Sequence, residues 1–351
     1  MKTPGASGWR AAAEALGGLV ERSSLHPTGT RWADARPARE NWGVALSGGA
    51  DSVALLLFLW VHWPDRRARL TAYHFNHRLR GKASDGDERF CKALCRALGI
   101  AFVSGKWTAA KRSRTEAAAR AARFEFLERE MKRRRSKVLW LGHQQDDIAE
   151  TMLMRLSRGS GTAGLAAPRP VHGFAGSGKA SGSFHVRPLL TLKKADIAKA
   201  LRKAGATWRE DESNAKDVHF RNRVRRSVLP AWVKASQRDA LAGAALSRQL
   251  LEEDNDALET WLASLDPFGV DGSLDLVRLK GRPRAVVRRA LYQWLQGVGG
   301  AGDFSRQAFT ILLHSVEVGS PVRHSLGSHG FAVIRSGRLR FETARKPRSL
   351  H

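Results

Sequence analysis

The sequence predicts an α/β protein in which a domain with a mostly parallel sheet precedes a smaller, mostly helical C-terminal domain. Three observations indicate this fold class. Short apolar runs alternate with helix-like segments between residues 42 and 157. Glycine or polar clusters follow three of these runs directly, and a long helical region begins near Trp232.

The strands and helices of the first domain follow from apolar runs and the residues that end them. We expect strands at Trp42–Leu46, Leu70–Phe75, Ile100–Val103 and Val138–Leu141. We expect helices at Val53–Trp63, before Pro64; at Asp85–Leu98, before Gly99; at Thr115–Arg135, with Thr115 as the cap; and at Asp146–Ser157.

The later elements are less regular. We expect a loop or hairpin at Pro168–Pro188, a helix at Leu192–Ala204, a long helical region at Trp232–Leu265, and late strands at Phe331–Ile334 and Arg338–Phe341. Residues 1–40 are expected to form a loosely attached extension with a short helix at Ala11–Val20, residues 41–232 the sheet domain and residues 233–351 the helical linker and C-terminal domain.

The net charge favours a polyanionic partner. Lys and Arg number 60 and Asp and Glu 33, which gives +27. Nucleic acid is the expected partner, although some organisms have basic proteomes in general. The two cysteines argue against a disulfide scaffold and exclude a four-cysteine zinc site. The longest apolar run, Val53–Val61, is too short for a membrane span, and no secretory signal is evident, so we expect a cytoplasmic protein without membrane contact.

The loop Ser47-Gly-Gly-Ala-Asp-Ser52 lies between a predicted strand and a predicted helix. Glycines let backbone amides approach an anion closely, and hydroxyls and a helix N-terminus add donors. This predicts a phosphate cradle; the alternative is a serine-capped turn before a buried helix.

This loop resembles the PP-loop of the N-type ATP pyrophosphatase superfamily. Further motifs follow in order: His74-Phe-Asn-His77-Arg-Leu-Arg80, Gly142-His-Gln-Gln-Asp-Asp-Ile-Ala-Glu-Thr151, Arg158-Gly-Ser-Gly161, Arg187-Pro-Leu-Leu190 and Arg221-Asn-Arg-Val-Arg225. Together they are similar to the motifs of the tRNA(Ile)-lysidine synthases. The resemblance is specific over residues 42–232 and weaker beyond them.

The resemblance implies an activity. Such an enzyme uses ATP and Mg²⁺ to adenylate the 2-oxygen of the wobble cytosine in tRNA(Ile) with a CAU anticodon. Free L-lysine then displaces AMP, which forms lysidine and changes the codon specificity from AUG to AUA. The rivals are another PP-loop enzyme, such as a tRNA 2-thiolase, and a catalytically inactive RNA-binding protein. An oligomer is compatible with this sequence.

The resemblance also implies an ATP site. Its residues are Ser47, Gly48, Gly49, Ala50, Asp51, Ser52, His74 and Asn76. Asp51 is expected to hold the leaving pyrophosphate and its Mg²⁺. For His74 and His77, three positions apart after a strand, zinc is one alternative and a bond to the backbone is the other.

Acidic residues open the helix after Gly142-His143, where the helix dipole alone would favour them. The functional alternative is that His143 contacts a phosphate or the adenylate. Asp147 or Asp146 would then bind Mg²⁺ or the lysine amine, and a carboxylate would take a proton from that amine.

Two basic segments complete the expected site. In Thr115–Phe124 the family's usual Tyr is replaced by Phe124, so a hydroxyl is lost. The second segment is Arg221–Arg226, and the planar guanidinium group of arginine can donate two parallel hydrogen bonds to a phosphate. The expected catalytic residues are Asp51, His143, Asp147 and Arg120, and the expected lysine and tRNA contacts are Glu116, Arg123, Asp146, Glu150, Arg221, Asn222, Arg223 and Arg225.

Cys91 and Cys95 lie one helical turn apart. A thiolase would use cysteines for sulfur transfer or for a cluster, but a face of small apolar side chains is the commoner explanation. No CxxC motif is present in the sequence, which weakens the thiolase alternative.

Overall fold

The computed structural model describes residues 4–25, 40–78, 81–107, 116–174, 183–210, 220–299, 304–327 and 330–343. The chain divides into two compact units, Met1–Leu251 and Glu252–His351. The division therefore falls later than the boundary after residue 232 that the sequence suggested. Within the described ranges, no helix combines the length and the apolar character that a membrane crossing requires.

A six-stranded sheet organises the first unit, with the strand order β3-β2-β1-β4-β6-β5. Its strands are β1 (Asn41–Ala45), β2 (Leu70–Asn76), β3 (Ala101–Lys106), β4 (Ser136–Trp140), β5 (Val171–Phe174) and β6 (Ser183–Val186). All neighbours pair in parallel except β5 and β6, which pair antiparallel. The segment expected to be a loop or hairpin thus also supplies β6, a parallel partner of β4.

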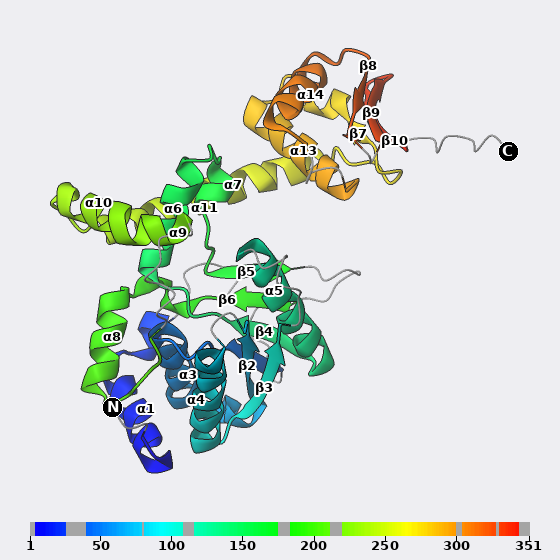
Figure 1. Cartoon of the computed structure of the whole chain (residues 1–351). Coiled ribbons are helices and arrows are strands. Elements are labelled where there is room, and N and C mark those ends of the chain that lie inside the picture. Colours follow the sequence, from blue (N-terminus) through cyan, green and yellow to red (C-terminus); the bar gives the residue numbers. More distant parts are fainter. Residues whose placement is uncertain are drawn as a thin grey trace. The chain divides into compact units, whose positions relative to one another are not determined.

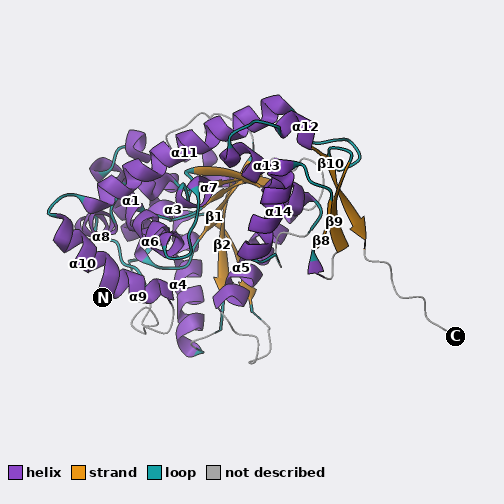
Figure 2. Cartoon of the chain, turned by 90° about the horizontal axis from the view of Figure 1, so that it is seen from above, coloured by secondary structure: helices purple, strands orange, loops and turns teal. Residues whose placement is uncertain are grey.

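Helices cover both faces of this sheet, with α3 and α4 on one face and α5 on the other (Figures 1 and 2). The helices of the sheet region are α1 (Ala6–Leu19), α3 (Ala50–His62), α4 (Lys82–Leu98), α5 (Glu116–Arg133), α6 (Gln145–Leu156), α7 (Thr162–Leu165) and α8 (Lys194–Lys203). Short 3₁₀ turns are η1 (Arg22–Leu25), η2 (Pro64–Arg69) and η4 (Pro188–Thr191). The cap expected at Thr115 lies outside the described residues.

The period of two along each strand separates two hydrophobic layers. Val44 and Trp140 belong to the cluster that contains α3, whereas Tyr73 and Leu139 pack with side chains of α5. Gly43 is required on the α5 side, because a Cβ there would lie 2.4 Å from the Tyr73 ring.

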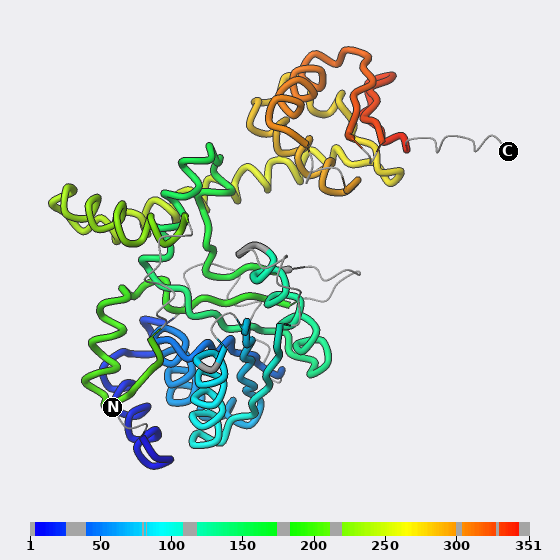
Figure 3. Tube along the Cα trace, in the orientation of Figure 1, coloured from blue at the N-terminus to red at the C-terminus, as the bar shows by residue number. Residues whose placement is uncertain are grey.

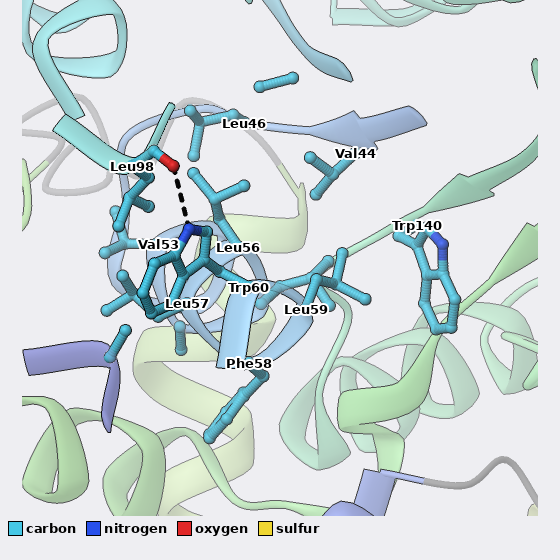
Figure 4. Packing of buried hydrophobic residues seen from close by; sticks show 14 of the residues in the cluster. Val44, Leu46, Val53, Leu56, Leu57, Phe58, Leu59, Trp60, Leu98 and Trp140 are labelled. Carbon is cyan, nitrogen blue, oxygen red and sulfur yellow. Dashed lines mark hydrogen bonds between the residues drawn. The ribbon is translucent and has the colours of Figure 1, made fainter. Parts of the chain in front are cut away.

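Helix α3 is apolar on all sides because it is covered all round. Its side chains from Val53 to Leu59 are at most 1% exposed (Figure 4). Trp60 lies among them, and its indole Nε1 donates a hydrogen bond to the carbonyl oxygen of Leu98 at 3.0 Å. This bond ties the end of α3 to the end of α4.

The N-terminal segment differs from the expected loose extension. Residues 6–19 form α1, which packs beside α3, α4 and α8 (Figure 3). Trp9 and Leu16 are at most 1% exposed, and the Trp9 ring meets Phe90 edge-on at 6.0 Å. The small residues Ala12 and Ala13 allow this close approach. The short helix expected at Ala11–Val20 thus begins earlier in the chain, at Ala6. Its packing was not expected, because two of its four buried residues are alanine.

The first unit ends in a helical segment. It comprises α9 (Phe220–Arg223), the π-helix η6 (Val224–Val228), α10 (Leu229–Ser236) and the beginning of α11 (Ala240–Leu265). The predicted continuous helix is interrupted at Gln237, which has a left-handed φ of 50°. Ile148 and Leu190 pack with Leu229 and Ala244, so this segment lies against α6 and η4.

The second unit is a helical layer on an antiparallel four-stranded sheet, ordered β7-β10-β9-β8. Its elements are β7 (Leu274–Asp275), α12 (Leu276–Leu279), α13 (Arg284–Gly297), α14 (Arg306–Val318), β8 (Val322–Ser325), β9 (Gly330–Arg335) and β10 (Arg338–Thr343). Leu291, Leu312 and Leu339 are fully buried in its core. The two late strands predicted from the sequence are β9 and β10.

Candidate active site

The Ser47–Ser52 loop follows β1 and leads into α3, and one serine side chain holds it in place. The Ser52 hydroxyl accepts bonds from the amides of Ser47 and Gly48, both at 3.2 Å, and donates to the Gly49 carbonyl at 3.0 Å. Gly48 has a φ of +93°, which favours glycine. Among the described residues no side chain caps α3, whose N-cap is Gly49 and whose first residue is Ala50. Its first amides can therefore bind an anion.

Asp51 is a half-buried residue with one enclosed carboxylate oxygen, Oδ1, that has no hydrogen-bond donor in the described part of the chain. Burial raises the pKa of Asp51 to about 6; the Asp147 charge adds to this rise, and Lys194 and Arg225 oppose it. An enclosed, unsatisfied carboxylate oxygen beside a phosphate cradle suits a hard cation such as Mg²⁺.

A pair of carboxylates on α6 meets two arginines from the distant α9 and η6. Arg221 binds Asp147 Oδ1 at 2.5 Å and Glu150 Oε2 at 2.9 Å. Arg225 binds Glu150 Oε1 at 2.5 Å and lies 3.6 Å from Asp147. Glu150 is 1% exposed, so its negative charge depends on these two arginines.

The two aspartates at the start of α6 have different surroundings. Asp147 accepts a bond from the Gln144 amide at 3.0 Å in a capping box, in addition to its contact with Arg221. Asp146 accepts the backbone N–H of Lys194 at 2.9 Å and thereby holds the beginning of α8. Of the two, Asp147 is the one that shares the network of Glu150.

The basic segment, which runs from α9 into the π-helix, has two faces. Arg221 and Arg225 point to the carboxylates, whereas Arg223 and Arg226 are exposed. Asn222 is half-buried between them. A π-turn widens the helix locally and is frequent at functional sites.

His143 follows β4 and lies among cations. Its Nδ1 is buried and finds no hydrogen-bond partner among the residues that the structure describes. Burial lowers the pKa of His143 well below its usual value, and Arg187, Arg221, Arg123 and Arg120 lower it further. The ring is therefore neutral at neutral pH. Burial also lowers the pKa of Arg123 and of Arg187 to about 10, so both remain cationic.

Four cations around a neutral histidine are suited to an anionic substrate. Arg120 is exposed on α5, and its guanidinium lies 5.2 Å from the ring centre of Phe124. Glu116 is the first residue of α5, but its side chain lies outside the described ones.

The polar residues at the end of β2 make internal contacts. His74 Nδ1 lies 2.8 Å from the Leu46 carbonyl oxygen, and Asn76 donates to Asp85 and Glu88 at 3.0 Å. Among the described residues, no group of three or more His, Cys, Asp or Glu side chains could hold a metal ion. For His74 the geometry is that of the backbone-bonded alternative.

The cysteines form an apolar contact against the loop. A Cβ at Gly48 would lie 3.2 Å from Cys91 Sγ. Burial raises the pKa of Cys91 and of Cys95, which keeps both as thiols. Sulfur transfer needs a reactive thiolate, so their environment argues against a thiolase role.

Three residues at the site were not among the expected site residues, although Arg187 opens one of the motifs of the resemblance. Arg187 follows β6, Lys194 begins α8, and the Arg209 amide donates to the Gly48 carbonyl at 2.9 Å. The rule that polar residues after parallel strands converge would have found Arg187 if Ser183–Val186 had been recognised as a strand.

Comparison with known proteins gives the family. The family model of the PP-loop domain matches residues 28–232, which is more than half of the chain. The chain belongs to the PP-loop family. The Ser47–Ser52 loop, between β1 and α3, lies within the matched residues of this PP-loop protein.

Its relatives share more than the loop. It is 36% identical over 282 residues to the tRNA(Ile)-lysidine synthase of Geobacter sulfurreducens, covering 76% of this chain and 56% of that protein. It is 37% identical over 222 residues to the Bacillus subtilis protein of the same name, covering 62% of this chain and 45% of that one. The chain thus spans about half the length of the curated relatives it matches.

A solved structure shares the fold. The U34-tRNA thiolase NcsA from Methanococcus maripaludis, solved with its [4Fe-4S] cluster, superimposes with a TM-score of 0.50 at 16% sequence identity. The match covers 69% of this chain and 78% of that chain. At this identity the likeness concerns the fold alone.

Proposed function

We propose that this PP-loop protein is a tRNA(Ile)-lysidine synthase, which uses ATP to join L-lysine to the wobble cytidine of a CAU anticodon. The observation that carries the proposal is the meeting of a phosphate cradle with a buried carboxylate pair at one end of the sheet. The charge of Asp147 acts directly on Asp51 in the loop. The names of the Geobacter sulfurreducens and Bacillus subtilis relatives support the same function.

The cradle suits ATP with Mg²⁺. The amides at the start of α3 would bind a phosphate, and the unmet Oδ1 of Asp51 would hold the cation. Asp147 fits the metal less well, because both of its oxygens already accept bonds. When bound, Mg²⁺ neutralises the charge that builds on the leaving pyrophosphate.

The reaction has two displacements. The 2-oxygen of cytosine attacks the α-phosphorus of ATP, and pyrophosphate leaves. The lysine ε-amine then attacks carbon 2, and the same oxygen departs with AMP. The arginines around His143 would stabilise the negative phosphoryl group in both steps, while the neutral His143 ring would offer a hydrogen bond.

The carboxylate pair suits the amine. Lysine arrives as an ammonium ion and must lose a proton before it attacks. Asp147 and Glu150 would provide the counter-charge, and one of them would accept that proton. Arg221 and Arg225 already balance these carboxylates, so the ammonium would compete with Arg221 for them and displace it toward the phosphoryl group.

The charge distribution supports RNA binding through the first unit. Residues 252–351 contain nearly as many acidic as basic side chains, so the surplus of +27 lies almost entirely before them. The exposed arginines Arg223 and Arg226 border the site and are well placed for phosphates of the RNA backbone.

Labelled lysine tests this function. The protein is incubated with ATP, Mg²⁺, radiolabelled L-lysine and unmodified tRNA(Ile) with a CAU anticodon, followed by a mild-base wash that removes aminoacyl esters. We expect ATP-dependent retention of label on the tRNA, and its loss in Asp51→Ala. RNA binding without label would contradict the function and favour an inactive RNA-binding protein.

A further inference from the structure

A cavity of about 270 Å³ lies in the first unit, where α6, η4 and α11 meet. Its walls are largely apolar and are formed by Ile148, Pro170, Pro188, Leu190, Ala245 and Leu246. Five polar residues complete the lining: Gln145, Arg187, Thr191, Arg248 and Gln249. Apolar walls with a few convergent polar groups are typical of a site for a small organic group.

Two of these polar groups have unmet hydrogen-bonding capacity. Gln145 is 7% exposed, and its Oε1 is buried without a partner in the described ranges. The Nε of Arg187 is likewise buried and unpartnered among the described residues, although Nη1 donates to the Arg169 carbonyl at 2.8 Å. With the cavity empty both atoms have almost no accessible surface, so a ligand in it would reach them only after a small turn of each side chain. Unmet buried groups are costly, which favours a ligand that supplies both a donor and an acceptor.

The cavity adjoins the reacting groups without containing them. Arg187 is the cation with the largest effect on His143, and Gln145 is two residues from that histidine. Among the described residues that line the cavity, however, there is no member of the Ser47–Ser52 loop and neither Asp147 nor Glu150. A group bound here would be a neighbour of the group that reacts.

We propose that this cavity binds an unpaired nucleobase that flanks the modified one in the RNA. The inference rests on the proposed function. A flat ring would pack on Ile148, Pro170 and Pro188. Its edge would donate to Gln145 Oε1 and accept from Arg187, which cytosine, adenine and uracil can all do.

Other ligands fit less well. A free amino acid could place its carboxylate on one of the two arginines, but no carboxylate among the described lining residues would receive its ammonium group. A phosphate would leave the apolar walls without a partner and would meet the acceptor Gln145 Oε1 unfavourably.

The proposal can be tested by enlarging a side chain at the opening of the cavity. Leu246 is 56% exposed and lines the cavity, so Leu246→Trp should fill it without disturbing the core. Leu250 lies one turn further along α11, is 51% exposed and does not line the cavity among the described residues, so Leu250→Trp is the matched control. The probes are an anticodon stem-loop and a set in which each unpaired loop nucleotide is replaced in turn by an abasic one.

We expect Leu246→Trp to weaken binding of the intact stem-loop about tenfold, the scale expected when one base is no longer bound, and Leu250→Trp to leave it unchanged. One of the abasic stem-loops should bind the natural protein about tenfold more weakly than the intact stem-loop does. Leu246→Trp should bind that abasic stem-loop and the intact one with equal affinity, because its base site is already filled. Gln145→Leu, which removes the acceptor, should show the same insensitivity to that one nucleotide.

Several results would overturn the inference. One such result is that Leu246→Trp binds the intact stem-loop as tightly as the natural protein does. Another is that every abasic stem-loop loses the same amount of affinity for the natural protein. A raised KM for lysine with unchanged RNA affinity would assign the cavity to the amino acid. Lysine incorporation by the natural protein is measured in parallel, so a failure of the proposed function is seen separately from a failure of the base site.

Discussion

Gly142, at the end of β4, lies directly against the backbone of Asp51. A Cβ at position 142 would stand 3.1 Å from both the carbonyl carbon and the oxygen of Asp51, and 3.2 Å from the Ser52 amide. These are backbone atoms, so they cannot rotate away as a side chain would. This contact fixes the position of the Ser47–Ser52 loop relative to the His143 segment.

Gly142→Ala should therefore push the loop away from β4. We expect kcat/KM for ATP to fall by at least about tenfold, because a small displacement of a positioned phosphate is costly. Gly243→Ala is the control, since Gly243 lies within α11 and a Cβ added there would meet no heavy atom within 4 Å. It should leave activity unchanged and stabilise the helix by about 0.5–1 kcal/mol. Equal ATP kinetics in both variants would contradict the proposed role of this close approach.

Asp51 should make stability depend on pH. Its pKa is about 6 in the folded protein and 3.8 in the reference state, so its favourable contribution is present below pH 4 and is lost as the pH rises through 6. In metal-free buffer, Asp51→Asn should equal the natural protein near pH 4 and exceed its unfolding free energy at pH 7 by up to about 3 kcal/mol.

Chemical unfolding at a series of pH values measures this difference. Asp239→Asn is a control of opposite sign, because Lys193 lowers the pKa of Asp239. Mg²⁺ should raise the Tm of the natural protein more than that of Asp51→Asn. A stability difference that stays constant from pH 4 to 7 would be inconsistent with a desolvated Asp51.

The exposed and buried arginines of the basic segment should behave differently. Arg223→Ala and Arg226→Ala together should weaken RNA binding and reduce the slope of log K against log salt by about 0.7 for each phosphate that is no longer neutralised. Arg225→Ala should instead destabilise the fold by up to about 3 kcal/mol, because the buried Glu150 loses one of its two arginine partners. Binding titrations at several salt concentrations and urea unfolding separate the two effects. An unchanged slope in the double variant would remove these side chains from the RNA interface.

Trp60→Phe should reveal the cost of one buried hydrogen bond. The substitution keeps an aromatic ring in the α3 core but leaves the Leu98 carbonyl without its indole donor (Figure 4). We expect a loss of about 1–3 kcal/mol in unfolding free energy. Trp232→Phe, at a side chain that is 36% exposed, should change stability by less than about 0.5 kcal/mol. Equal effects in the two variants would show that the bond to Leu98 contributes nothing.

Much of the first unit was predictable, because its strands are apolar runs ended by polar clusters. The Ser47–Ser52 loop and the acidic start of α6 were found for this reason. The pairing of Arg221 with Glu150 was not predictable, since 71 residues separate them and no local pattern links them. The short N-terminal helix was expected, but its packing on the domain was not, because alanine carries little hydrophobic signal. Strand β6 was missed because glycine and serine precede it. Glu116 was expected at the site because it lies in a motif of the resemblance, but its side chain is outside the described ones, so its place stays a prediction.

The identity of the modified nucleoside tests the proposed chemistry most directly. After reaction with ATP, Mg²⁺ and L-lysine, tRNA(Ile) with a CAU anticodon is digested to nucleosides, and their masses are measured by mass spectrometry. Lysidine synthesis predicts that one cytidine gains the mass of lysine less one water, and that Asp51→Ala leaves it unmodified. An unmodified cytidine with the natural protein, or a nucleoside in which sulfur has replaced oxygen, would contradict it.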